Sequence, residues 1–125
     1  MQQPPTVLLV DDIPLFRQAI RDAVESWGAR VVAEAANGRE ALSRYAEYRP
    51  DLVFLDIMMP EMDGIEALRW LRRYDPDARV IMCSSIKDSQ MIYAAIRLGA
   101  LDFVPKPFTG ARIAEALSLA AGGVA

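Results

Sequence analysis

Acidic side chains stand directly after two short apolar runs of this sequence. Asp11 and Asp12 follow the run at residues 6–10, and Asp56 follows the run at residues 52–55. A carboxylate in such a position can act as a nucleophile or as a ligand for a hard cation such as Mg²⁺. Each also has an ordinary structural interpretation, because the acidic pair could cap a helix and Asp56 could belong to a turn.

A hydroxyl and an amine occupy corresponding positions later in the chain. Ser84 follows the apolar run at residues 80–83, and Lys106 comes just after the run at residues 101–104. A metal ion, an amine and a hydroxyl together would form a cradle for a phosphoryl group. Asp56 is the expected nucleophile, since it is solitary and the most deeply placed on a central strand. Taken singly, Ser84 also fits a turn and Lys106 fits an exposed loop.

The composition excludes several other chemistries. The 125 residues include no histidine and one cysteine, Cys83, so Ser-His-Asp catalysis, zinc sites and an internal disulfide are ruled out. Fourteen basic and seventeen acidic residues give a net charge of −3, which argues against nucleic acid as a direct partner. No apolar run reaches the length of a membrane span, and the first residues lack a signal pattern, so we expect a cytoplasmic protein.

Apolar periodicity predicts the elements that must position these residues. Strands alternate with helices five times, and the connections between them are short. The expected strands are 6–10, 30–35, 52–55, 80–83 and 101–104, and the expected helices begin near Pro14, Asn37, Asp63, Asp88 and Thr109. This order predicts a parallel sheet with helices on both faces. All carboxyl ends of its strands share one edge, where the acidic, hydroxyl and amine groups should meet.

Five motifs carry a resemblance to a known family. They are Val10-Asp11-Asp12, Leu55 to Pro60 with Asp63-Gly64, Cys83-Ser84-Ser85, Gly99-Ala100, and Lys106-Pro107-Phe108. Over essentially its whole length the chain resembles the receiver domain of two-component response regulators, and it looks closest to single-domain chemotaxis regulators. The resemblance implies a flavodoxin-like (βα)5 fold in three layers, with strand order 2-1-3-4-5. It also implies a single receiver domain over residues 1–125, with a core at about 6–121.

The same resemblance assigns roles to the acidic residues. It implies a phosphorylation-activated signalling switch rather than an enzyme, since the chain would catalyse only its own phosphorylation and slow dephosphorylation. Asp56 would accept a phosphoryl group from a sensor histidine kinase. Asp12 and Asp56 would bind Mg²⁺ directly together with the backbone carbonyl of Met58, and Asp11 would act through a metal-bound water.

Further roles are implied for the switch and its output. Ser84 and Lys106 would bind phosphoryl oxygens, and Phe103 would be the aromatic side chain that reports the state of Ser84. The fourth helix, fifth strand and fifth helix would form the switching surface, with Ile92, Tyr93 and Phe103 as apolar contacts. For Ile92 to face outward, Ala95 and Ile96 would fill the buried side of the fourth helix. The output partner would be a flagellar motor switch component or a downstream effector domain, with no membrane involved.

Three alternatives remain at this stage. The chain could be a receiver excised from a larger regulator with a methylesterase or DNA-binding output. An aspartate-nucleophile phosphatase would need a second carboxylate where Met58 stands. A flavin carrier would need a phosphate-binding loop where Asp11 and Asp12 would repel the cofactor. Because Met58 and Ile86 are both apolar and flank the expected phosphoryl site, we also expect slow self-hydrolysis of a phosphorylated form.

Overall fold

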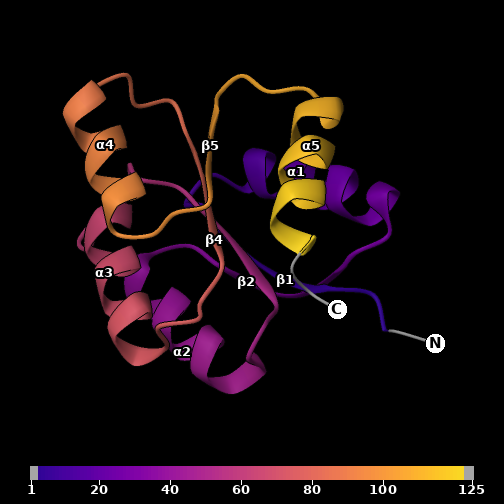
Figure 1. The fold of residues 1–125 in the computed structure, drawn as a ribbon, viewed down its shortest axis with the longest axis horizontal. Helices are drawn as coiled ribbons and strands as arrows, with labels where there is room; N and C mark the ends of the chain where they lie inside the picture. The colour runs from indigo at the N-terminus through magenta and orange to yellow at the C-terminus, as the bar shows by residue number, and fades with distance from the viewer. Residues whose placement is uncertain (1–2, 123–125) are drawn as a thin grey trace.

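A computed structural model describes residues 3–122 of the chain, which form one sheet between two layers of helices (Figure 1). The elements in chain order are β1 (Thr6–Val10), α1 (Pro14–Trp27), β2 (Arg30–Ala35), α2 (Gly38–Tyr48), β3 (Leu52–Leu55), α3 (Gly64–Tyr74), β4 (Val80–Ser84), α4 (Ser89–Arg97), β5 (Asp102–Pro105) and α5 (Gly110–Ala121). Among the described residues, no helix is both long and apolar enough to span a membrane.

The five strands are all parallel, as the alternation of elements predicted, and they lie in the order β2-β1-β3-β4-β5, as the family resemblance implied. The register brings the carboxyl ends of neighbouring strands side by side. Val10 at the end of β1 is opposite both Ala35 of β2 and Leu55 of β3. Ser84 at the end of β4 is opposite Pro105 of β5. The residues that follow these strands therefore emerge along one edge of the sheet.

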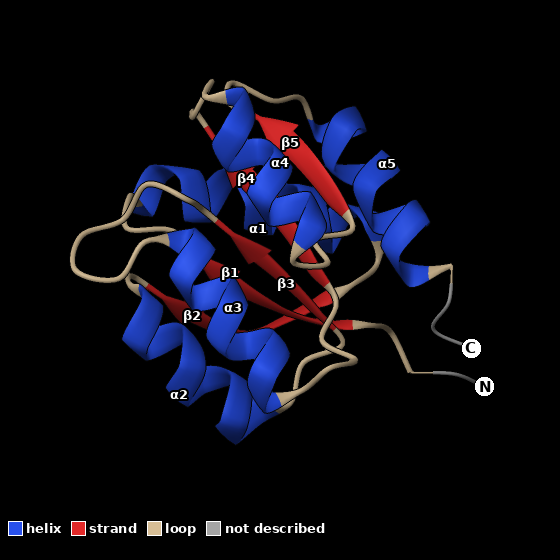
Figure 2. Ribbon diagram, turned by 60° about the vertical axis from the view of Figure 1, so that its left-hand side comes forward, coloured by secondary structure: helices blue, strands red, loops and turns tan. Residues whose placement is uncertain are grey.

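Helices α1 and α5 cover one face of the sheet, and α2, α3 and α4 cover the other (Figure 2). Successive strand residues point to opposite faces, so each strand contributes to both cores. In β1, for example, Leu8 packs on the α2–α4 side and Leu9 on the α1–α5 side. Cys83 of β4 lies in the core on the α1–α5 side, where burial raises the pKa of its thiol to about 12.

Side-chain caps begin four of the helices: those of α2, α3 and α5 were predicted from the sequence, and Asp88 also caps α4 by accepting from the backbone N–H of Gln90. The backbone N–H of the third residue after the cap donates to Asn37 in α2, to Asp63 in α3 and to Thr109 in α5. Helix α1 differs, because Ile13 occupies its cap position and makes no side-chain cap bond. The interpretation of the Asp11-Asp12 pair as a helix cap is therefore wrong.

The orientation of α4 corrects one expectation. Ile96 is 45% exposed, so it does not fill the buried side of the helix together with Ala95. The residues that contact the core from this helix and its end are Met91, Ala95 and Leu98, which are spaced four and three apart and therefore share one helical face. Ile92 is only half-buried, and Tyr93 is 62% exposed.

Candidate functional site

Three carboxylates converge at the edge of the sheet where the sequence predicted them. One oxygen each from Asp11, Asp12 and Asp56 lies within 4.8 Å of the others, although the residues come from two strand ends far apart in sequence. Asp56 is 3% exposed and Asp11 is 1% exposed, so both carboxylates are buried. Asp56 is the carboxylate that follows the central strand β3.

Lys106 enters this cluster from the end of β5. Its Nζ lies 2.6 Å from Oδ2 of Asp11 and 3.1 Å from Oδ2 of Asp56, and the lysine side chain is buried. The ammonium also lies 3.9 Å from the centre of the Phe16 ring, close enough for a cation–π contact. Burial lowers the pKa of Lys106, but the hydrogen bond that its ammonium donates to Asp11 and the negative charge of Asp56 outweigh burial and raise the pKa overall. The amine is therefore charged at neutral pH, and the alternative of an exposed loop lysine is wrong.

The charge of this cluster favours a bound cation. Burial raises the pKa of Asp11, and the charge of Asp56 adds to this effect, against opposing hydrogen bonds from Lys106 and from the backbone of Ile13. One ammonium faces three carboxylates, so negative charge is left over. Within the described part of the chain, Oδ1 of Asp12 is buried without a hydrogen-bond partner. Converging oxygen ligands, one of them unsatisfied, fit a hard divalent ion such as Mg²⁺.

The backbone holds Asp56 in a fixed direction. Its Oδ1 accepts a hydrogen bond from the backbone N–H of Met58 at 3.1 Å, and its own N–H donates to the carbonyl of Val10 at 3.0 Å. The first turn of α3 closes over this loop at Gly64, where an added Cβ would lie only 2.0 Å from the Asp56 carbonyl oxygen. A glycine is therefore required for the helix to approach the loop this closely.

Ser84 and Phe103, the other two strand residues assigned to the switch, lie on neighbouring strands. Ser84 is fully buried at the end of β4, and its Oγ accepts a hydrogen bond from the backbone N–H of Ile86 at 3.3 Å. Phe103 of β5 is half-buried and packs against the core on the α2–α4 side. Ser84 thus lies at the same sheet edge as the carboxylates, and Phe103 lies beneath α4 rather than free on the surface.

A cleft of about 440 Å³ opens beside the acidic cluster. It is lined by Asp12, Ile57, Met58, Met59, Pro60, Asp63, Ile86 and Met91. The Met58 side chain is 54% exposed, and its sulfur accepts a hydrogen bond from Oγ of Ser85 at 3.7 Å. Most of the lining is apolar, so a group bound next to Asp12 would have few side chains beside it that could hold a water.

Two residues of α1 contact the site although sequence reasoning treated them only as parts of an amphipathic helix. The Phe16 ring lies under the Lys106 ammonium, and Arg17 donates to the backbone carbonyl of Asp11 at 2.6 Å. The available signal was their position, because both lie in the first turn of the helix that follows Asp12. The first turn of a helix after a parallel strand lies at the same edge as the end of that strand.

Comparison with known proteins gives consistent matches. The response regulator receiver domain family matches residues 7–118. The chemotaxis protein CheY of Listeria monocytogenes is 50% identical over 115 residues, which cover 92% of this chain and 97% of that protein. The receiver domain of NarL from Mycobacterium tuberculosis superposes with a TM-score of 0.90 at 33% identity, covering 98% of this chain and 99% of that one. A chain of the CheX–CheY–BeF3–Mg²⁺ complex from Borrelia burgdorferi has a TM-score of 0.89 at 34% identity, covering 92% and 87%.

Proposed function

This chain belongs to the response regulator receiver domain family, and from that premise we propose that it is a signalling switch phosphorylated on Asp56. The observation that carries the proposal is the convergence of three carboxylates and Lys106 at one edge of the sheet. Its similarity to CheY proteins over more than nine-tenths of its length favours a role in chemotaxis signalling. A sensor histidine kinase would supply the phosphoryl group.

In the proposed reaction, a carboxylate oxygen of Asp56 attacks the phosphorus atom of the donor. A new oxygen–phosphorus bond forms, and the bond from phosphorus to the leaving group breaks and leaves its electron pair on that group. Asp12, Asp56 and the Met58 carbonyl would hold a Mg²⁺ ion, with Asp11 acting through a water. A bound Mg²⁺ would supply positive charge that stabilises the oxygens of the transferred group. Lys106 would supply a second positive charge.

The proposed switch follows from the charge that phosphorylation adds. An aspartyl phosphate carries more negative charge and more acceptor oxygens than the carboxylate that it replaces. Ser84 and Lys106 would turn toward these oxygens and bias the surface formed by α4, β5 and α5. On that surface Tyr93 is exposed, whereas Ile92 and Phe103 are half-buried. The output partner, such as a flagellar motor switch component, would bind there.

The direct test is incubation with acetyl phosphate in the presence of Mg²⁺, followed by mass spectrometry of the intact protein and of its peptides. The expected result is a mass gain of one phosphoryl group, located on the peptide that contains Asp56. Chelation of Mg²⁺ with EDTA should prevent the gain. A chain that stays unmodified with Mg²⁺, or that is modified on another residue, would contradict the proposal.

Replacement of Met58 by asparagine is expected to shorten the lifetime of the phosphorylated protein several-fold. Hydrolysis requires a water to be held next to phosphorus, and an amide at position 58 can hold one, whereas the exposed thioether is a weak acceptor. The measurement is the loss of the phosphoryl mass over time after acetyl phosphate is removed. Met58→Leu, which keeps an apolar side chain of similar size, is the control and should decay like the wild type. An asparagine variant as long-lived as the wild type would count against this role of Met58.

A further inference from the structure

The carboxylate of Asp12 has little to fix its direction except the backbone. Its Oδ1 is buried and makes no hydrogen bond within the described residues. Asp11, by contrast, is held by Lys106 and by the N–H of Ile13. Because a side chain turns with the peptide that carries it, the direction of the Asp12 carboxylate depends on what fixes the Asp11–Asp12 peptide.

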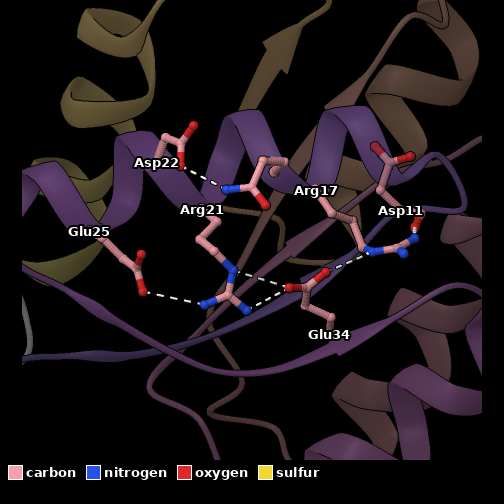
Figure 3. Close-up of polar contacts among 7 residues, drawn as sticks. Asp11, Arg17, Arg21, Asp22, Glu25 and Glu34 are labelled. Carbon is pink, nitrogen blue, oxygen red and sulfur yellow. Dashed lines mark hydrogen bonds and ion pairs between the residues drawn. The ribbon is translucent and has the colours of Figure 1, made fainter.

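One arginine of α1 fixes that peptide to the neighbouring strand. Nη1 of Arg17 donates to the carbonyl oxygen of Asp11 at 2.6 Å, and Nε of the same side chain donates to Oε1 of Glu34 at 2.8 Å. Figure 3 shows Arg17 between these two acceptors, with its guanidinium bridging Asp11, directly after β1, and Glu34 of the strand β2. The Arg17 side chain is 19% exposed, so water competes only weakly for these bonds.

Glu34 is itself firmly held. Oε2 of Glu34 accepts from Nη2 of Arg21 at 2.5 Å and from Nε of Arg21 at 3.1 Å (Figure 3). Burial alone would raise the pKa of Glu34, but the hydrogen bonds from Arg21 and Arg17 outweigh it and hold the pKa below its usual value. Glu34 is therefore an ionised anchor at neutral pH. Arg21 shares this anchor but contacts Glu25 rather than the loop that carries Asp11.

We propose that Arg17 is a positioning residue for the acidic site, anchored by Glu34, which fixes the Asp11–Asp12 peptide so that Asp12 faces a divalent ion. This inference rests on the proposed function, in which Asp12 is a metal ligand. Arg17 also acts on the ion in the opposite sense, since its positive charge lies near the site and repels a cation. The sign of the effect of removing Arg17 therefore separates positioning from simple charge.

The test is a calorimetric titration of the full chain with Mg²⁺. Arg17→Met keeps the length and the apolar stem but removes both hydrogen bonds and the charge. We expect it to raise the dissociation constant for Mg²⁺ about fivefold, as the loss of roughly one hydrogen bond's net free energy implies. A dissociation constant that stays equal or falls would overturn the proposal, because only the repulsive charge would then matter.

Arg21→Met is the matched control. It removes a cation that binds the same carboxylate, at a similar exposure, without touching Asp11. We expect its Mg²⁺ affinity to stay within about twofold of the wild type, since no bond to the site is lost. An equal weakening in both variants would assign the effect to Glu34 or to general stability and would overturn the role of Arg17. Glu34→Gln is a second test of the same role, because it weakens the acceptor that holds Arg17 while Arg17 itself remains. We expect it to raise the dissociation constant for Mg²⁺, as Arg17→Met does.

A measurement on the metal-free protein separates this inference from the proposed function. The backbone N–H of Ile13 donates a hydrogen bond to Oδ1 of Asp11 at 2.9 Å, within the loop that Arg17 contacts. Its hydrogen exchange should be faster in Arg17→Met and unchanged in Arg21→Met, with global stability followed by urea unfolding. If the wild type binds no Mg²⁺, the proposed function fails, but the exchange rates still test whether Arg17 fixes the Asp11–Asp12 peptide. Equal exchange of the Ile13 amide in the wild type and in Arg17→Met would overturn this role of Arg17.

Discussion

Asp56→Asn is expected to gain no phosphoryl group from acetyl phosphate at any Mg²⁺ concentration. Asparagine is neutral and a poor nucleophile, but its amide oxygen can still accept the hydrogen bond that Oδ1 of Asp56 takes from the Met58 N–H. The variant should therefore fold and lose only the chemistry. Intact-mass spectrometry after a fixed incubation measures the result directly.

Asp63→Asn is the control for this substitution. Asp63 lines the same cleft and caps α3 by accepting from the N–H of Glu66. Asparagine is as good a helix cap as aspartate, so the same chemical change at this position should leave the fold and phosphoryl uptake intact. Uptake by Asp56→Asn at the wild-type rate would instead move the nucleophile to Asp11 or Asp12.

Lys106→Met is expected to destabilise the metal-free protein by about 3 kcal/mol at neutral pH, the loss typical of removing one partner from a buried ion pair. Asp11 and Asp56 would keep their burial and lose the ammonium that lies within hydrogen-bond distance of both. Urea unfolding measures the change. Mg²⁺ should recover part of the loss, because a cation among these carboxylates would replace the missing charge.

The same variant should respond to pH in a definite direction. Burial already raises the pKa of Asp11, and without Lys106 the opposing hydrogen bond and charge are gone, so this pKa rises further. A folded-state pKa above the unfolded value means that the folded chain binds the proton more tightly. The stability deficit of Lys106→Met relative to the wild type should therefore shrink as the pH falls from neutral toward mildly acidic values.

Lys87→Met is the control that tests whether the loss of stability is specific to the replacement of Lys106. Lys87 is exposed in the loop before α4, and its replacement should change the free energy of unfolding by less than about 0.5 kcal/mol. If Lys106→Met is as stable as Lys87→Met without Mg²⁺ and at neutral pH, the ion pairs with Asp11 and Asp56 contribute nothing to the folded state.

The fold and the centre of the site could be predicted because both follow from local patterns. Apolar runs such as residues 52–55 specify buried strands, and the capping residues Asn37, Asp63 and Thr109 mark where helices begin. The parallel order then brings Asp56 and its partners to one edge by topology alone. No side-chain detail was needed for that step.

Other features depend on distances that the sequence does not contain. The phase of α4 is ambiguous in a short helix with several apolar residues, which is why Ile96 was placed inward although it lies outward. The contact between Arg17 and Glu34 joins a helix to a neighbouring strand. It affects the site only because the same guanidinium also reaches the carbonyl oxygen of Asp11. Such bridges are set by packing rather than by a periodic pattern.

The buried thiol of Cys83 gives the molecule a practical property. Only the thiolate reacts with alkylating reagents, and a pKa of about 12 in the core leaves almost none of it at neutral pH. A fluorophore could therefore be attached through a cysteine introduced at Tyr93 on α4 while the native sulfur stays unlabelled. Slow labelling of Cys83 itself would report how often the whole sheet opens, since the reagent reaches that sulfur only when the chain unfolds.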